Sequence, residues 1–541
     1  MTRRRTSSLT VGLAATALLA SACGGGGGAG GAGGGPAPVA VGSNTPDNRP
    51  VRTGGNLALA LAEDPDVLDP TLARTLVSRL VFVSMCEKLY DIDKDLNVVP
   101  QLAAAKPEIS ADQKTVTIKL RQGVKFNDGT PFDAAAVKKS LDRHRTLKGS
   151  TRTSELATVT SVDVVDPGTV ALKLSKPYAP LTAQLADRAG MVMSPAQLDK
   201  LGDKFGTEPV CVGPFEFVSR TPGSEIVLQK SPDYYDAGQV KLDRVSYRII
   251  TDANARLANA KSNDVQVAER IGATDIPGVQ ADRSVRLVGV PSLGYQGITV
   301  NIGNEKGVGE PAGTVDSPLA KSELRKAFDL ALDREAINKV VFAGQYTPGC
   351  SPLPPVSPFH DPSISCPRNL EEAKRLVAAS GVPTPVPVQL IVGTSPDNLR
   401  LAQVVQSLTR EAGFDVQVQP TEFASALDQA DAGKFQMFQV GWSGRIDPDG
   451  NIYNQLHSGA PLNSSGTSDP RLDELLEQGR TVTDQAERKR IYSEVMKIAA
   501  ENRGILYLYY PKSFLVTTPA VAGLEYFADG LPRLKTAGLA Q

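Results

Sequence analysis

Strand patterns alternate with amphipathic helix patterns along most of the chain, and this alternation limits the folds open to it. Residues 56–62 and 115–120 are typical of strands, and Asp133 is placed to cap a helix reaching Thr146. Further strands are expected at 159–165, 169–174, 414–419, 435–442 and 506–516, and further helices begin at Asn369, Ser395, Asp469 and Asp484. The pattern predicts an α/β architecture.

Length and charge narrow the class of protein. With 541 residues, of which 41% are hydrophobic and 22% charged, the chain is too long for one hydrophobic core, so two or more are expected. The formal net charge is −1, and the Lys and Arg residues are spread along the chain. Nucleic-acid binding is therefore not expected.

The N-terminus has the composition of an export signal. Arg3, Arg4 and Arg5 precede an apolar run at 11–20, which is too short to span a bilayer as a mature helix. Residues 1–22 are therefore predicted to be a signal peptide. Cys23 follows small residues, as in a bacterial lipobox, and is the predicted lipidation site; the alternative is a soluble secreted protein cleaved near Ala22.

A Gly-rich stretch follows Cys23. Residues 24–35 are nearly all Gly, and such chain behaves as a flexible coil. We therefore expect residues 23–52 to be a lipidated tether that holds an exported globular body at the outer face of the cytoplasmic membrane.

Four cysteines remain in the expected mature body. An even number in an exported chain indicates disulfides, and four cysteines allow three connectivities. We favour Cys350–Cys366, which closes a short Pro-rich loop, together with Cys86–Cys211. The sequence has no CxxC pair and three histidines, so no metal site is expected.

Several motifs resemble one known family. Residues 117–137 (TIKLRQGVKFNDGTPFDAAAV) are similar to the signature of the family 5 extracellular solute-binding proteins, the dipeptide/oligopeptide/nickel-binding group. Other segments resemble the family in the same order: 86–90 with 99–103, 212–215 with 231–236, 324–337, and 441–442 with 447–449.

The resemblance implies a two-lobed periplasmic-binding-protein-like fold of type II, cluster C, with an extra subdomain in the first lobe. The implied map gives lobe I as 53–88, 209–303 and 512–541, the subdomain as 89–208, and lobe II as 304–511. Hinges would lie at Val300-Asn301 and 507–511. On this map Cys86 and Cys211 lie where the chain leaves for the subdomain and returns.

The resemblance also implies a site between the lobes. In peptide-binding members the ligand main chain adds like a strand to protein strands. Here the strand leading to Trp442 is the expected partner, with Ser443 and Gly444 offering backbone groups. Asp64, Leu68, Tyr295 and Gln296 are further candidates for ligand contact.

One position departs from the family pattern. The family's anchor for a ligand amine is an Asp three residues after the Trp, and this chain has Arg445 there. A guanidinium repels an ammonium group, so either Asp447 or Asp449 takes over the anchoring, or Arg445 receives a carboxylate or phosphate. A plainer interpretation is that residues 447–450 form only a turn.

The implied function is that of a substrate-binding lipoprotein of an ABC importer, a monomer without cofactor, which captures short peptides and delivers them to a membrane permease. Two alternatives remain: the same role with a sugar, metal chelate, haem or other metabolite, or an envelope lipoprotein without a transport role. The sequence has no GxSxG, HExxH or Walker A motif, so an enzyme is not expected.

Overall fold

The first lobe is built on a mixed seven-stranded sheet. A computed structural model describes residues 49–541, so the expected signal peptide and Cys23 lie outside the described residues. Strand β2 is parallel to both of its neighbours, β11 and β12. The strand order is β13 (Arg286–Pro291), β20 (Lys512–Thr517), β12 (Val267–Glu269), β2 (Asn56–Leu61), β11 (Arg244–Ile249), β10 (Glu225–Lys230) and β9 (Phe215–Thr221).

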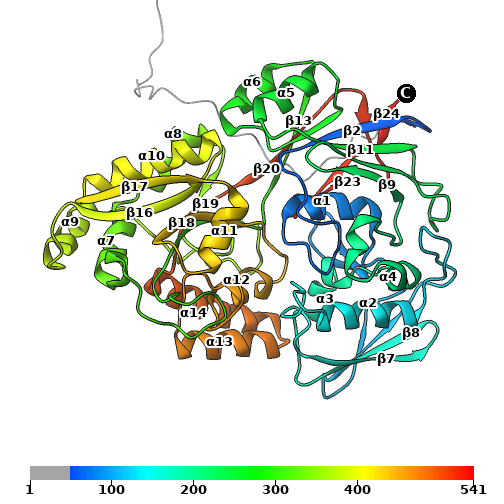
Figure 1. The fold of residues 1–541 in the computed structure, drawn as a ribbon, viewed down its shortest axis with the longest axis horizontal. Coiled ribbons are helices and arrows are strands. Elements are labelled where there is room, and N and C mark those ends of the chain that lie inside the picture. Colours follow the sequence, from blue (N-terminus) through cyan, green and yellow to red (C-terminus); the bar gives the residue numbers. More distant parts are fainter. Residues whose placement is uncertain (1–48) are drawn as a thin grey trace, which may run out of the picture.

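The sequence of β2, NLALAL, shows why this sheet is covered on both faces. Alternate side chains of a strand point to opposite faces. The leucines at 57, 59 and 61 pack in the core that contains α1 (Leu76–Met85), whereas Ala58 and Ala60 pack against α5 (Ala253–Lys261) and α6 (Ile276–Ala281), the latter preceded by η3 (Ala273–Asp275). Figure 1 shows α5 and α6 on the outer side and α1 on the inner side.

The subdomain has its own four-stranded antiparallel sheet but shares a core with the first lobe. Side chains of β6 and α2 belong to the same hydrophobic cluster as β2 and α1. The sheet order is β5 (Glu108–Ile109), β6 (Thr115–Lys119), β8 (Thr169–Leu174) and β7 (Val159–Asp166). The other elements are β3 (Tyr90–Ile92), β4 (Val98–Pro100), α2 (Ala134–Thr146), α3 (Leu181–Gln184), η1 (Arg188–Gly190), α4 (Pro195–Leu201) and η2 (Gly202–Thr207).

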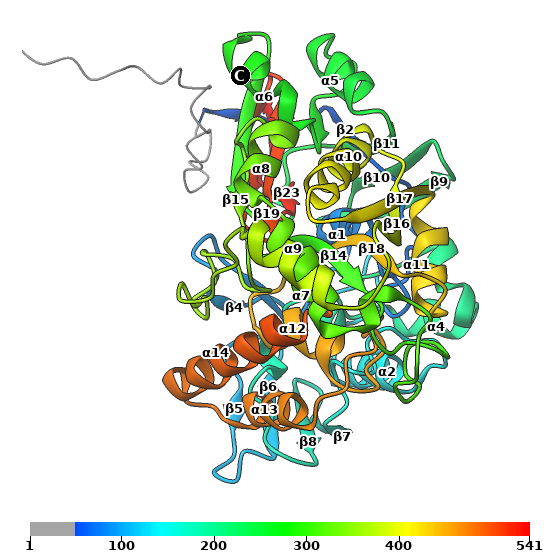
Figure 2. The ribbon, with the colours of Figure 1, turned by 90° about the vertical axis from the view of Figure 1, so that its left-hand side faces the viewer.

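The second lobe is a six-stranded sheet with helices around it. Its strand order is β15 (Thr347–Pro348), β19 (Ile505–Tyr510), β14 (Tyr295–Val300), β18 (Met437–Trp442), β16 (Val386–Gly393) and β17 (Phe414–Thr421). Its helices are η4 (Pro318–Ala320), α7 (Ser322–Ala331), α8 (Arg334–Phe342), α9 (Leu370–Ala379), α10 (Pro396–Arg410), α11 (Phe423–Asp431), α12 (Asp449–Leu456), α13 (Pro470–Thr481) and α14 (Gln485–Asn502). In Figures 1 and 2, α13 lies beside the subdomain, and the backbone N–H of Ala179 donates to the carbonyl of Arg480 at 2.8 Å.

The chain crosses between the lobes at two short segments, and this corrects two expectations. Strand β13 is in the first sheet and β14 in the second, so the first crossing lies at 292–294 and not at Val300-Asn301. Likewise 506–516 is not one strand. It divides at Pro511, which has no N–H for a ladder, into β19 of the second lobe and β20 of the first.

The ends of the described chain meet at the first lobe. After β20, β21 (Val521–Ala522) and β24 (Gly538–Ala540) form a small sheet with β1 (Val51–Arg52), and β22 (Glu525–Tyr526) pairs with β23 (Pro532–Arg533). Val51 and Arg52, at the expected end of the tether, already pair with Ala540 and Leu539.

Both favoured disulfides are confirmed. Cys86 is bonded to Cys211 with the Cα atoms 4.9 Å apart, and Cys350 is bonded to Cys366 with the Cα atoms 5.6 Å apart. The first bond joins the end of α1 to the segment returning from the subdomain. Within residues 49–541, no helix combines the length and the apolar character that crossing a bilayer requires.

Candidate ligand-binding site between the lobes

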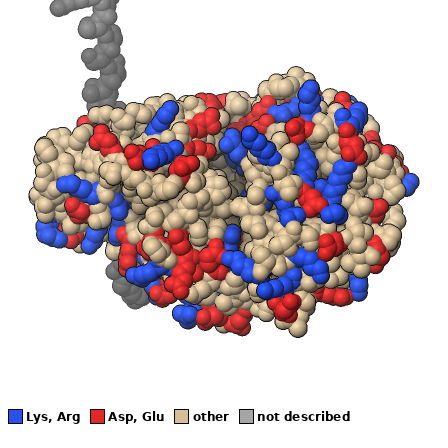
Figure 3. Space-filling view, turned by 60° about the horizontal axis from the view of Figure 1, so that its bottom comes forward, with Lys and Arg blue, Asp and Glu red and all other residues tan. Residues whose placement is uncertain are grey.

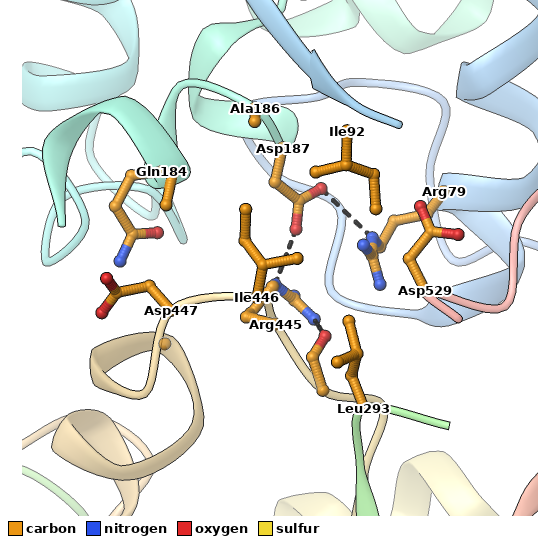
Figure 4. A pocket seen from close by; sticks show the side chains of 13 residues that line it. Arg79, Ile92, Gln184, Ala186, Asp187, Leu293, Arg445, Ile446, Asp447 and Asp529 are labelled. Atoms are coloured by element: carbon orange, nitrogen blue, oxygen red, sulfur yellow. Dashed lines mark hydrogen bonds and ion pairs between the residues drawn. The ribbon is translucent and has the colours of Figure 1, made fainter. Parts of the chain in front are cut away.

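A small cavity lies where the first lobe, its subdomain and the second lobe meet. Its free volume is about 20 Å³, which is room for about one water molecule. The surface is hollowed between the lobes, with Lys and Arg side chains bordering the hollow (Figure 3). The wall combines Arg79 and Asp529 of the first lobe, Gln184 and Asp187 of the subdomain, Leu293 of the crossing, and Gly444, Arg445, Ile446, Asp447 and Gly450 of the second lobe (Figure 4).

The second-lobe wall is a loop between β18 and α12 that is held by Asn451. Its Oδ1 accepts hydrogen bonds from the backbone N–H of Arg445 at 2.6 Å and from Nε1 of Trp442 at 3.1 Å. Its Nδ2 donates to the carbonyl of Arg445 at 2.7 Å. This buried amide thus fixes both the loop and the indole that precedes it.

Gly444 lets the loop approach the crossing segment closely. Its φ is +82°, and a Cβ at this position would lie 2.2 Å from the carbonyl carbon of Leu293. Gly294 is equally confined, because its Cβ would lie 1.8 Å from the carbonyl oxygen of Trp442. The backbone of the loop therefore packs directly on the first crossing, and only glycine fits at both points of contact.

Arg445 reaches across the cavity to the opposite lobe. Its Nε lies 2.6 Å from Oδ2 of Asp187, and Nε of Arg79 donates to the other oxygen, Oδ1, at 3.1 Å (Figure 4). On its own side, Nη1 of Arg445 donates to Oγ of Ser443 and to the carbonyl of Gly444. The guanidinium lies 4.9 Å from the centroid of the Trp442 ring, a cation–π distance.

The pKa values of this group reflect burial and crowding of like charges. Burial raises the pKa of Asp187, but attraction to Arg79, Arg445, Arg188 and Arg152 outweighs that effect and holds the pKa well below its usual range. Burial, followed by repulsion from Arg79, lowers the pKa of Arg445 to about 10.

The two aspartates considered as amine anchors already have arginine partners. Both oxygens of Asp447 accept from Arg488 at 2.8 Å. Asp449 is 2% exposed and accepts from Nε of Arg480 at 2.6 Å and from its Nη2 at 3.1 Å. The backbone N–H of Asp449 also donates to Oδ1 of Asp447, so the segment does form the turn that the plainer interpretation expected.

Asp449 also joins the lobes. Tyr178 and Gln184 of the subdomain donate to its Oδ2 at 3.5 and 3.4 Å. Burial raises its pKa, although Arg480 opposes this. The Asp449–Arg480 pair of the second lobe is thus in contact with the subdomain through Tyr178 and Gln184.

The structure brings together only some of the residues expected at the site. Gly444, Arg445 and Asp447 line the cavity, and Ser443 and Trp442 support Arg445 from outside it. The remaining candidates lie elsewhere: Asp64 pairs with Arg220, Leu68 is fully buried in the core, Tyr295 packs edge-on against Tyr507, and Gln296 accepts from Gln439. Ligand contact by any of these residues stays a prediction.

Sequence reasoning missed the opposite wall. Arg79 and Asp187 come from distant parts of the chain, and nothing in the sequence shows that they meet Arg445. One signal was present: Arg79 is the sole charged residue of α1, whose sequence is LVSRLVFVSM, and a charge within an apolar helix needs a partner.

Comparison with known proteins agrees with this architecture. Residues 97–463 match the family described as bacterial extracellular solute-binding proteins, family 5 Middle. The chain is 28% identical over 458 residues to the glutathione-binding protein GsiB of Escherichia coli, covering 82% of this chain and 86% of the relative.

Two solved structures have the same fold. The periplasmic binding protein AgaA of Agrobacterium tumefaciens R10, in complex with agropinic acid, has a TM-score of 0.80 at 28% identity, covering 90% of this chain and 99% of that one. DppA of Helicobacter pylori, in complex with the peptide STSA, has a TM-score of 0.82 at 22% identity, covering 91% and 99%. The chain thus belongs to family 5 of the bacterial extracellular solute-binding proteins, the ligand-capturing components of ABC importers.

Proposed function

We propose that this solute-binding protein captures a peptide-type ligand between its lobes and delivers it to a membrane permease, while a lipid on Cys23 anchors it to the outer face of the cytoplasmic membrane. The names of the relatives support the ligand class, since one is described as binding glutathione and another was solved with the peptide STSA. The protein acts as a monomer and binds its ligand without chemical change.

The cavity is the observation that carries the proposal. Its wall is supplied by both lobes and by Leu293 of the crossing segment, so any relative motion of the lobes opens or closes it. At about 20 Å³ it is too small for a peptide in the present arrangement. Ligand entry therefore requires the lobes to separate about the crossings at 292–294 and Pro511. The lobes would then close on the ligand by a hinge motion.

Strand β18 offers an edge on which a peptide main chain can add. Strand β16 pairs with β18 only at Met437 and Phe438, whereas β14 pairs with all six of its residues. Among the described strands, residues 439–442 thus have no ladder partner on the β16 side. This stretch leads directly into Gly444 and Arg445 of the cavity, which supports β-augmentation as the mode of binding.

A non-peptide acid is the second candidate ligand. Arg445 favours it, because a guanidinium binds a carboxylate in a fixed geometry whether or not the rest of the molecule is a peptide. The relative AgaA was solved with agropinic acid, which is a ligand of this kind by name.

Mass spectrometry of ligand carried through purification decides between these candidates. A panel of di- to pentapeptides, followed by thermal unfolding, then tests the peptide directly. A ligand at 100 times its Kd that binds only the native state adds about 2.7 kcal/mol to the free energy of unfolding. Absence of any shift and of any calorimetric signal across the panel would remove the peptide from the proposal.

The anchor is tested by cell fractionation. Wild-type protein should sediment with membranes and incorporate labelled palmitate, whereas Cys23→Ala should do neither. Sedimentation of the Cys23→Ala protein with washed membranes at the wild-type level would contradict lipid anchoring through this residue.

A further inference from the structure

An arginine cluster, defined here as Arg79, Arg152, Arg188 and Arg445, surrounds Asp187 at the meeting point of the lobes. The side chains of the four arginines are 6%, 4%, 2% and 11% exposed, so water does little to screen them. Their carboxylate partners within residues 49–541 are Asp187 and Glu155, the latter bonded to Arg152 at 2.5 Å. The cluster thus has two positive charges more than its partners supply.

Neighbouring carboxylates do not remove this excess. Asp447 and Asp449 are each paired with an arginine of the second lobe, Arg488 and Arg480. Asp529, on the cavity wall, is bonded to both terminal nitrogens of Arg533 at 2.6 and 2.8 Å. Each of these aspartates is neutralised by its own partner, so none is left to balance the cluster.

Donors in the cluster are also left unused. Nη1 of Arg79 and Nε of Arg188 are buried and have no hydrogen-bond partner among residues 49–541. Nε of Arg188 lies 4.0 Å from Asp187, beyond hydrogen-bonding distance. Oδ2 of Asp187 is likewise buried without a hydrogen-bond partner among residues 49–541, although Nε of Arg445 lies 2.6 Å from it, and buried polar groups without partners are costly.

We propose that the arginine cluster is an acid-binding subsite, in which Arg445 of the second lobe and Arg79 of the first receive a carboxylate of the ligand. This proposal rests on the proposed function. Both arginines line the cavity and face it from opposite lobes, so one acid group between them holds the lobes closed. Arg188 and Arg152 are not among the residues that line the cavity, but they act electrostatically on Asp187. The subsite places an acid, not an amine, at the end of the β18 strand.

The test is isothermal titration calorimetry of the mature protein with tetraalanine, which has no ionisable side chain. Three forms are compared: free termini, a C-terminal amide, and an N-terminal acetyl group. Removing one partner of a buried charge pair is expected to weaken binding about 100-fold, so the amide should lose that much while the acetylated form stays within about threefold. Equal affinity of the amide and the free acid, with no tighter binding when one alanine is replaced by glutamate, would overturn the subsite.

A second arm identifies which carboxylate is bound. Amidated tetraalanine with one alanine replaced by glutamate restores binding if the subsite takes side-chain carboxylates, and fails to restore it if the subsite takes the terminal carboxylate. Arg445→Gln should abolish the difference between free acid and amide. Arg490→Gln, on the exposed surface of α14, should preserve it.

The failure of the subsite can be distinguished from the failure of the peptide proposal. If no form of tetraalanine binds, the peptide proposal is weakened, and the subsite is judged by the ligand found by mass spectrometry after purification. An acidic ligand supports the subsite, and a neutral or cationic one overturns it.

Discussion

Arg445 and Asp187 face one another across the two lobes, with Nε of the guanidinium 2.6 Å from Oδ2 of the carboxylate. Asp187 also accepts from Arg79 of the first lobe, so a single carboxylate joins the first lobe, the subdomain and the second lobe. If a carboxylate of the ligand binds between Arg445 and Arg79, it takes the position that the carboxylate of Asp187 occupies in the present arrangement.

Asp187→Asn should lower the free energy of unfolding by about 3 to 5 kcal/mol, because it leaves the arginine cluster without its shared carboxylate. Asparagine retains an oxygen for the backbone N–H of Arg188, so the local cap is kept. Urea unfolding measures the change. Asp199→Asn is the matched control, since that carboxylate is 73% exposed in its pair with Lys139, and its loss should cost less than about 1 kcal/mol. Equal effects of the two substitutions would contradict the role of Asp187.

His144 should make the protein less stable as pH falls from 6.5 to 4. It is fully buried, and burial lowers its pKa from 6.5 to about 4. In this window the unfolded chain binds the proton and the folded chain does not, so about 3 kcal/mol of stability is lost on acidification. The neutral ring is bonded to Thr71 Oγ1 at 2.9 Å and to the carbonyl of Met191 at 3.1 Å.

Urea unfolding between pH 7 and pH 4 checks this dependence. His144→Gln keeps a polar side chain in α2 but has no group that titrates in this range. Its stability should therefore fall less steeply than that of the wild type over the same interval. Parallel curves for the two proteins would show that His144 does not contribute.

Gly444→Ala should disturb the cavity through the backbone. The new Cβ would meet Leu293 and Gly294 at less than 3.0 Å, in addition to the strain of a positive φ. We expect a loss of about 3 kcal/mol or more and a weaker response to ligand. Gly459→Ala separates the two effects, because its φ is +69° but the nearest atom to its Cβ is 3.9 Å away. That control should cost only the strain of the left-handed backbone, about 1 to 2 kcal/mol.

Local patterns predicted the elements and much of one wall of the site. Asp133 caps α2 by accepting from the N–H of Ala136, as its spacing indicated, and Asn369 does the same for α9 through Glu372. The loop at 444–447 was located because it follows a recognisable motif. These features depend on neighbours within a few residues, which a sequence displays directly.

The features that were missed depend on tertiary packing. Pro511 divides a continuous apolar run into strands of two different sheets, and periodicity alone does not reveal which sheet a residue joins. Asp187 is one of many aspartates in the sequence, and only the folded chain places it between Arg79 and Arg445. Asn451 likewise acts through the geometry of a loop, which composition does not specify.

Asp187 and Arg445 should be energetically coupled. Once Asp187→Asn has removed the carboxylate, Arg445→Gln removes one of the positive charges that repel each other. The double variant should therefore lose less stability than the sum of the two single variants, by about 1 to 3 kcal/mol. Urea unfolding of the four proteins gives this coupling energy. Combining Asp187→Asn with Arg490→Gln, which lies on the surface in a pair with Glu487, should be additive within about 0.5 kcal/mol. If the effects of Asp187→Asn and Arg445→Gln also proved additive, the contact between Asp187 and Arg445 would contribute no coupling energy to stability.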